Sequence, residues 1–294
     1  MDLIDNVTHS SRQIEQTYDN IGTGPAVILL HGYPFDRSMW REQIDFLSTH
    51  GYRVIAPDLR GFGETVAQTS DRDSDGPDHR LKSVPLTTMA DMAGDVAALM
   101  DEFRIDQAVI CGLSMGGYVA FEFAHLFPAR VSALVLAGTR APADNEQEKE
   151  GRFQQVEQML AHGMNGIADA SLRKLLAPRT FAEKPEVVAR LREIILRADP
   201  HGAAAAQRGM AARRNYSGDL PSIKAPAFVI VGREDPIRPV ADAEFMHRGL
   251  SGSRLEIIDD AAHMTNMEQP EVFNRELLAF LKTLDITAGA SPPS

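Results

Sequence analysis

Cysteine and positive charge are both scarce in this sequence. Cys111 is the one cysteine among 294 residues, so the chain cannot form an internal disulfide or build a cysteine-based zinc cage. Low cysteine usage fits a reducing compartment. Lysine and arginine number 30 against 41 aspartates and glutamates, which gives a net charge of −11. Because an acidic surface repels nucleic-acid phosphates and anionic membranes, we expect neither as a partner.

Long apolar runs are missing as well. The apolar segments are far shorter than the roughly 20 residues that a membrane-spanning helix needs. Residues 1–5 also lack a basic stretch followed by an apolar run, which is the pattern of a secretory signal peptide. Together with the low cysteine usage, these features predict a cytoplasmic protein.

Short apolar runs rich in β-branched residues are present instead. Such near-continuous runs are typical of strands that are covered on both faces, as in a parallel sheet. Six of them predict strands, at residues 26–30, 53–56, 107–111, 133–137, 227–231 and 255–258. A weaker pattern at Ile14, Gln16 and Tyr18 suggests an antiparallel edge strand before them.

Helical patterns separate the predicted strands. An apolar stripe over residues 89–103 predicts a helix, and Thr88 with Asp91 forms a plausible capping box at its start. A second stripe over residues 273–284 follows Pro270. The alternation of strands with helices predicts an α/β fold with right-handed crossovers.

Three segments depart from this alternation. Residues 139–219 carry helical stretches without strand-like runs, and strands lie on both sides, so they predict a helical cap insertion. The core domain then consists of residues 1–138 and 220–286. Residues 66–85 are polar and predict a long loop, and the tail at 287–294 is small, contains proline and is expected to be disordered.

A turn between a predicted strand and a predicted helix carries the first chemical motif. It reads Gly112-x-Ser114-x-Gly116. Such a turn holds the serine in strained backbone geometry with its hydroxyl exposed, and the two glycines leave room for neighbouring backbone. The following helix N-terminus supplies free N–H groups. We interpret Ser114 as a nucleophile; the alternative is a glycine-rich turn with a solvent-facing serine.

A serine hydroxyl needs a base to take its proton. The sequence has nine histidines. His263 follows the strand at 255–258 by a short loop, which places it at the sheet edge where open α/β proteins bind ligands. We predict that His263 is the base. His31 follows the strand at 26–30 in the same way, and we expect it to be structural.

The base in turn needs a carboxylate that fixes its tautomer. Asp235 lies just beyond the carboxyl end of a strand and is our candidate. The rivals are Glu234, Asp259 and Asp260, but the last two are so close to His263 in sequence that they would more naturally shape its loop. The resulting chain order of serine, aspartate and histidine is the order expected for this type of site.

The oxyanion that forms during acyl transfer needs at least two fixed donors. The backbone N–H of Met115, the residue after the nucleophile, is one candidate. The other is the N–H of Tyr33, because Gly32 lets that backbone approach and Pro34 has no N–H to donate.

These residues together resemble the α/β-hydrolase superfamily, over residues 13–284. The matching motifs are HGYP at 31–34, DLRGFG at 58–63, GLSMGG at 112–117, GRED at 232–235 and AH at 262–263. The resemblance implies an eight-stranded, mostly parallel sheet flanked by helices, with a helical cap over the site. Dehalogenases and epoxide hydrolases of this superfamily carry aspartate at the position of the nucleophile, which corresponds to Ser114. A serine there favours the branch of small esterases and enol-lactonases.

The predicted activity is hydrolysis of a small carboxylic ester, thioester or lactone through an acyl-enzyme intermediate. Ser114 would attack the carbonyl while His263 accepts its proton, and neither a metal nor an organic cofactor is required. The alternatives that stay open are a cofactor-free perhydrolase, a C–C hydrolase or lyase, and a ligand receptor that turns over slowly on the same scaffold.

Candidates for substrate contact are few. Phe35, Trp40 and Tyr118 could form an apolar wall of the pocket, although residues of this kind more often belong to the core. Arg140, just past the strand at 133–137, could bind a substrate carboxylate, or it could be a solvated loop arginine.

Overall fold

Seven strands form the central sheet in the residues that the structure describes. The computed structural model describes residues 15–65 and 86–285, and within them the strand order is β1-β3-β2-β4-β5-β6-β7. Strand β1 pairs antiparallel with β3 at one edge, and the other strands run parallel. The bounds are β1 Tyr18–Ile21, β2 Ala26–Leu30, β3 Arg53–Pro57, β4 Ala108–Leu113, β5 Val131–Ala137, β6 Ala227–Gly232 and β7 Arg254–Ile258.

All six predicted parallel strands are confirmed, each to within two residues at either end. Strands β2, β4 and β6 are buried along their whole length, as their continuous apolar sequences indicated. The antiparallel edge strand also exists and begins at Tyr18, whereas Ile14 lies outside the described residues. The described residues hold seven strands and not the expected eight, because only β1 precedes β2 there.

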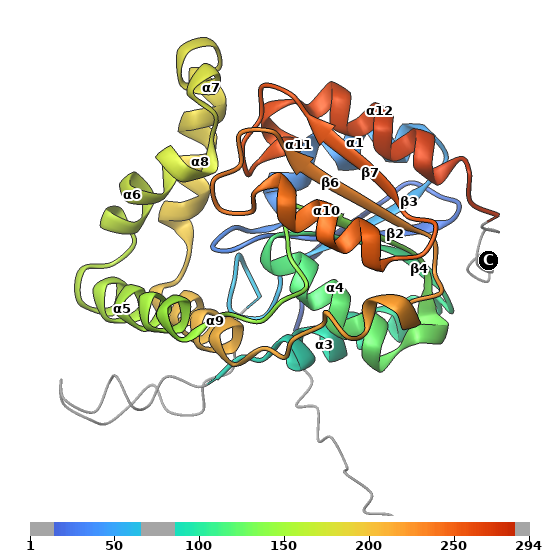
Figure 1. Cartoon of the computed structure of the whole chain (residues 1–294), viewed down its shortest axis with the longest axis horizontal. Coiled ribbons are helices and arrows are strands. Elements are labelled where there is room, and N and C mark those ends of the chain that lie inside the picture. Colours follow the sequence, from blue (N-terminus) through green and yellow to red (C-terminus); the bar gives the residue numbers. More distant parts are fainter. Residues whose placement is uncertain (1–14, 66–85, 286–294) are drawn as a thin grey trace, which may run out of the picture.

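Helices cover both faces of the sheet (Figure 1). On one face lie α1 (Arg41–Thr49), α11 (Thr265–Glu268) and α12 (Pro270–Leu281), and on the other lie α3 (Met89–Glu102), α4 (Met115–Leu126) and α10 (Val240–Gly249). Three single-turn 3-10 helices join these elements: η1 Arg37–Trp40, η2 Pro128–Arg130 and η3 Leu220–Ser222.

The two helices predicted in most detail are confirmed. Helix α3 starts with the expected capping box: the Asp91 N–H donates to Thr88 Oγ1 over 3.0 Å, and the Thr88 N–H donates to Asp91 Oδ2 over 2.8 Å. These bonds satisfy two of the N–H groups that a helix start leaves unpaired. Helix α12 begins at Pro270, three residues before the predicted stripe, and ends at Leu281, three residues before the end of the stripe.

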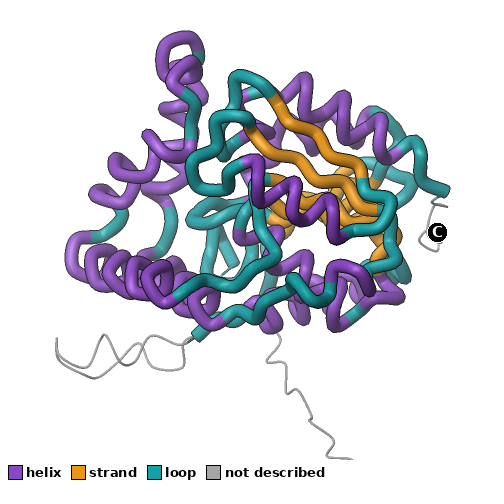
Figure 2. Tube along the Cα trace, in the orientation of Figure 1, coloured by secondary structure: helices purple, strands orange, loops and turns teal. Residues whose placement is uncertain are grey.

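Five helices lie between β5 and β6 in the chain, within the predicted insertion. They are α5 Glu146–His162, α6 Asn165–Leu175, α7 Pro178–Glu183, α8 Pro185–Arg197 and α9 Pro200–Ala212. Figure 1 shows this α5–α9 segment standing to one side of the α/β body, and Figure 2 shows that the segment contains helices and loops only. Helices α5 and α9 pack against each other, as do α6 and α8.

The strand register brings five loops to one edge of the sheet. Leu30 pairs with Gly112 and Leu113 pairs with Ala137, so β2, β4 and β5 end almost level. Strands β6 and β7 end together as well, at Gly232 and Ile258. The loops that carry the candidate site residues therefore leave the sheet from a common edge, as open α/β folds require.

Two predicted segments, the loop at 66–85 and the tail at 287–294, lie outside the described residues. Among the helices of residues 15–65 and 86–285, none is long and apolar enough to cross a membrane.

Candidate active site

Ser114 stands at a strained turn between β4 and α4. Its backbone angles are φ 55° and ψ −111°, a combination that costs a non-glycine residue free energy. Two backbone hydrogen bonds hold the turn: the Ser114 N–H donates to Ala137 O over 2.9 Å, and the Gly117 N–H donates to Ser114 O over 3.0 Å. The Thr139 hydroxyl also donates to Ser114 O, over 2.9 Å. Several contacts thus fix a geometry that presents the Ser114 side chain, which is half-buried.

The glycines around Ser114 are required by close packing, as predicted. A Cβ atom on Gly112 would lie 2.1 Å from Gly116 O, and a Cβ on Gly116 would lie 2.1 Å from Leu30 O. Real Cβ atoms do not approach backbone oxygens so closely, so either substitution would push β2, β4 and α4 apart. The motif therefore reflects a tight strand–turn–helix junction.

His263 and Asp235 are joined by a hydrogen bond. His263 Nδ1 lies 2.8 Å from Asp235 Oδ2, and both residues are almost fully buried. Asp235 Oδ1 accepts the N–H groups of Ile237 and Arg238, over 2.8 and 2.9 Å. Because these two donors hold the carboxylate in place, a proton on Nδ1 faces Asp235 and leaves Nε2 as a base.

The rival carboxylates point elsewhere. Asp259 pairs with the exposed Arg233, and Asp260 pairs with Arg179 of α7 over 2.7 Å. Glu234 is exposed. Among the predicted candidates, Asp235 is thus the carboxylate that contacts the histidine.

Ser114 and His263 flank the same short stretch of backbone. Ser114 bonds to Ala137 O, and the next residue, Gly138, packs against the imidazole: a Cβ on Gly138 would lie 3.4 Å from His263 Nδ1. No hydrogen bond joins the Ser114 hydroxyl to His263 among residues 15–65 and 86–285. Such bonds are often long in ligand-free enzymes and tighten when substrate binds.

The loop after β2 orients the Tyr33 N–H. The Gly32 carbonyl is occupied by His31 Nδ1 at 2.8 Å and by the Phe35 N–H at 3.0 Å. In a trans peptide the N–H points opposite to the carbonyl, so the Tyr33 N–H faces away from these partners. The Met115 N–H is the first of α4 and has no partner within the helix. Neither of these two predicted oxyanion donors has a hydrogen-bond acceptor among residues 15–65 and 86–285.

His31 has the structural environment that we expected. Its Nε2 accepts the Leu59 N–H over 2.9 Å, and its Nδ1 lies 2.8 Å from Gly32 O. These partners assign a neutral ring with its proton on Nδ1. Burial lowers the pKa of His31 below its ordinary value, in keeping with that neutral form.

The candidate pocket residues Phe35 and Trp40 are buried apolar side chains. Phe35 lies beside Gly32, whose Cβ would come within 3.1 Å of the Phe35 ring, so it borders the loop that carries the Tyr33 N–H. Trp40 packs on Phe273 of α12, with ring centroids 6.0 Å apart. The structure thus places Phe35 near the site and Trp40 in the core on the α12 face.

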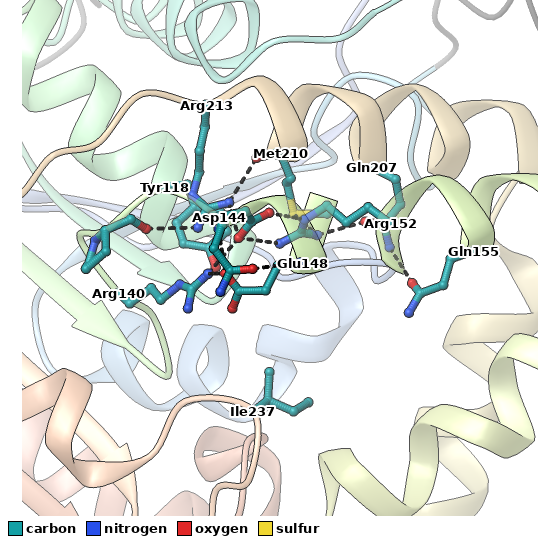
Figure 3. Close-up of polar contacts among 12 residues, drawn as sticks. Tyr118, Arg140, Asp144, Glu148, Arg152, Gln155, Gln207, Met210, Arg213 and Ile237 are labelled. Carbon is teal, nitrogen blue, oxygen red and sulfur yellow. Dashed lines mark hydrogen bonds and ion pairs between the residues drawn. The ribbon is translucent and has the colours of Figure 1, made fainter. Parts of the chain in front are cut away.

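Tyr118 of α4 and Arg140 belong to a polar cluster that lies beside helices α5 and α9 (Figure 3). Arg238 donates to the Tyr118 hydroxyl, and the Arg213 guanidinium lies 4.1 Å from the centre of the Tyr118 ring. Burial alone raises the pKa of Tyr118, but the guanidiniums of Arg238, Arg213 and Arg152 outweigh it and lower that pKa.

Asp144 lies at the centre of this cluster (Figure 3). Arg140 and Arg213 bind it over 2.7 and 2.8 Å, and Arg152 binds its other oxygen. Arg140 also pairs with Glu148 over 2.7 Å. The proposed carboxylate-binding role of Arg140 stays a prediction, but the structure gives Arg140 two internal carboxylate partners and excludes the solvated-loop alternative.

Replacing Asp144 by asparagine should destabilise the protein strongly. The change leaves three guanidiniums without their shared charge, and breaking a buried pair costs about 3 kcal/mol or more. Burial alone would raise the pKa of the Asp144 carboxyl, but the Arg152 hydrogen bond and the neighbouring guanidiniums hold it well below its ordinary value. Its stabilisation is therefore present above about pH 4 and is lost as the pH falls below that.

Urea unfolding of wild type and Asp144→Asn at several pH values tests this expectation. The difference in unfolding free energy should be constant between about pH 5 and 8 and should narrow below about pH 4. The control is Asp45→Asn, which removes the exposed pair with Arg41 and should cost less than about 1 kcal/mol. Equal costs for the two variants would contradict the anchoring role of Asp144.

Sequence reasoning missed the donors that hold Asp235. Asp235 is followed by Pro236, and an aspartate before a proline favours a turn in which the carboxylate accepts N–H groups two and three residues on. That signal could have indicated Ile237 and Arg238. Among residues 15–65 and 86–285, no group of three or more His, Cys, Asp or Glu residues could hold a metal ion.

Comparison with known proteins identifies the family of this chain. The sequence model of the family described as alpha/beta hydrolase fold matches residues 25–270. The chain is 30% identical to 3-oxoadipate enol-lactonase 2 of Acinetobacter baylyi over 277 residues, which cover 94% of this chain and 96% of that protein.

Solved structures give the same result. A thermophilic esterase from Thermogutta terrifontis is 38% identical, with a TM-score of 0.86 over 94% of this chain and 96% of the esterase. The enol-lactonase from Burkholderia xenovorans LB400 is 28% identical, with a TM-score of 0.80 over 92% of this chain and 97% of that one. The expected resemblance to esterases and enol-lactonases is confirmed, and the chain belongs to the alpha/beta hydrolase fold family.

Proposed function

We propose that this protein is a serine hydrolase that cleaves small carboxylic esters, thioesters or lactones through an acyl-enzyme intermediate. The observation that carries the proposal is the Asp235–His263 hydrogen bond beside the strained turn of Ser114. The similarity to proteins named esterase and enol-lactonase supports the ester or lactone chemistry.

In the first half of the reaction, Ser114 Oγ forms a bond to the substrate carbonyl carbon and passes its proton to His263 Nε2. The carbonyl oxygen becomes an oxyanion, which the Tyr33 and Met115 N–H groups bind. When this intermediate collapses, the bond to the leaving oxygen or sulfur breaks and His263 returns the proton to it. The acyl group stays on Ser114.

Water completes the reaction by the same steps in reverse. His263 takes a proton from water as the water oxygen attacks the acyl carbon, and then gives that proton to Ser114 Oγ as the acid leaves. Asp235 stabilises the imidazolium in both halves. Each oxyanion donor contributes on the order of 3 kcal/mol to the barrier reduction.

The α5–α9 segment would act as the cap that covers this site. Met159 of α5 contacts Tyr33, with the Tyr33 hydroxyl 3.7 Å from the Met159 sulfur. Leu175, the last residue of α6, contacts the backbone of His263. The segment thus contacts both the oxyanion loop, residues 31–36, and the histidine loop, residues 259–264. A segment in this position can exclude water and shape the pocket for the acyl group.

A serine-reactive phosphonate tests the proposal. We expect it to stop the hydrolysis of p-nitrophenyl acetate, and mass spectrometry of the digested protein should find the label on Ser114. Multiple turnovers by the unlabelled protein would separate an enzyme from a slow receptor, and product formation that requires peroxide would indicate a perhydrolase. A label on any other serine, with Ser114 unmodified, would falsify the assignment.

A further inference from the structure

The loop that carries His263 is fastened to the α5–α9 segment through its backbone. The N–H groups of His263 and Met264 both donate to Leu175 O, each over 3.1 Å. Leu175 is the last residue of α6, and the final carbonyls of a helix have no partner within the helix. The backbone position of His263 is therefore set by a residue that lies outside the strands of the sheet.

A buried carboxylate strengthens this connection. Glu268, the last residue of α11, is completely buried. Its Oε1 accepts the Ala262 N–H over 2.8 Å. Its Oε2 accepts the Ala177 N–H and the Thr180 hydroxyl, each over 2.6 Å. One carboxylate thus joins the residue that precedes His263 to two residues at the start of α7.

All three hydrogen-bond partners of the Glu268 carboxylate are donors. Burial raises the pKa of the Glu268 carboxyl, while the bonds from Thr180, Ala177 and Ala262 oppose that rise. The Ala262 N–H needs an acceptor on one side of the carboxyl group, and the Ala177 N–H and the Thr180 hydroxyl need one on the other side. The two oxygens of a carboxylate satisfy all three donors. A side chain with one acceptor oxygen could not satisfy both backbone N–H groups.

Other contacts also hold α7 and the histidine loop together. Arg179 binds Asp260, and Lys184 donates to the Glu268 carbonyl. Because the N–H groups of residues 262, 263 and 264 are all bonded, the histidine loop cannot shift along the sheet edge without breaking them. The imidazole can then move mainly by rotation about its own side-chain bonds, which the Asp235 contact limits.

We propose that Glu268 is a positioning residue, which holds His263 in line with Ser114 by tying the histidine loop to residues 177–180. The inference rests on the proposed function, since it assigns His263 the role of base. Glu268 itself does not touch the reacting atoms; it sets the place from which His263 does.

The main test is Glu268→Gln. The variant keeps the size of the side chain but puts an NH₂ group opposite either the Ala262 N–H or the Ala177 N–H, so one of the two connections becomes a donor–donor contact. Titration with a fluorescent phosphonate counts the working sites. We expect kcat per titrated site to fall about 10-fold or more, because small misplacements of a catalytic group are costly, while KM changes less than about twofold.

A purely structural role would give a different result. It would lower the melting temperature and the number of titrated sites, and leave kcat per site within about twofold of the wild type. That outcome would overturn the proposal. The matched control is Glu271→Gln, an exposed glutamate three residues later, which should match the wild type in kcat and KM.

A second pair of variants decides the matter even if Glu268→Gln does not fold. Thr180→Val removes one donor to Glu268 with little change of shape, and Thr180→Ser keeps that donor. We expect kcat per titrated site to fall about threefold or more in Thr180→Val and to recover in Thr180→Ser. Equal values for Thr180→Val and the wild type would count against a positioning role for Glu268.

The wild-type protein in the same assay separates this inference from the proposed function. If the wild type shows no ester turnover at Ser114, the proposed function fails. If it turns over at Ser114 and Glu268→Gln equals it per titrated site, only the positioning role fails.

Discussion

Ser114→Ala should lower kcat for p-nitrophenyl acetate by about 10,000-fold or more, because the proposed mechanism depends on the Ser114 hydroxyl as its nucleophile. The residual rate would come from the oxyanion donors and the binding of substrate alone. Since the fold already imposes the strained angles at residue 114, alanine should occupy the turn without rearrangement. Circular dichroism should therefore be unchanged, and the melting temperature should stay within about 3 °C of the wild type.

Ser251→Ala provides the control for this experiment. Ser251 is exposed in the turn before β7, so its loss should leave turnover unchanged. Wild-type turnover by Ser114→Ala, retained when the protein is purified to constant specific activity, would show that the nucleophile lies elsewhere.

Asp235→Asn should lower kcat by about 10,000-fold, by analogy with the serine-protease triad. The reason is that the side-chain amide of the introduced asparagine can take only one orientation. The N–H groups of Ile237 and Arg238 require an oxygen on their side, so the asparagine NH₂ group must face His263 Nδ1. An NH₂ donor there demands a lone pair on Nδ1, which moves the proton to Nε2 and leaves no base for the serine.

Asp259→Asn is the matched control. Asp259 lies in the same loop as His263 but is exposed and pairs with Arg233, so kcat should stay within about twofold of the wild type. The pH dependence of kcat/KM, measured for both variants, checks that the loss in Asp235→Asn is not a shift of the pH optimum. A strong loss in Asp259→Asn with full activity in Asp235→Asn would exchange the two roles.

Local patterns were enough for the elements that hold the site. Short apolar runs rich in β-branched residues predicted β2 to β7, and the runs of β2, β4 and β6 are continuous because these strands are buried on both faces. The motif around Ser114 predicted a tight junction, because only glycine fits where residue 112 meets Gly116 O. In both cases the physical requirement acts on neighbours in the chain, so the sequence displays it directly.

The candidate pocket residues could not be separated from core residues in the same way. Phe35 and Trp40 are both buried aromatics, and sequence alone assigned them one environment. The structure places Phe35 in the oxyanion loop and Trp40 against α12. An apolar side chain makes no directional contact such as a hydrogen bond, so its position in the sequence does not indicate whether it lines the site or packs in the core.

The sequence by itself determined the strands, the tight turn at Ser114 and the order of the candidate catalytic residues, because each depends on residues close together in the chain or on the shared edge of parallel strands. Only the tertiary structure showed that Asp144 forms ion pairs with three arginines and that Glu268 joins the histidine loop to residues 177 and 180. Ala177 and Glu268 are 91 residues apart. A hydrogen bond over that separation depends on how the α5–α9 segment packs against the sheet, and no local pattern records it.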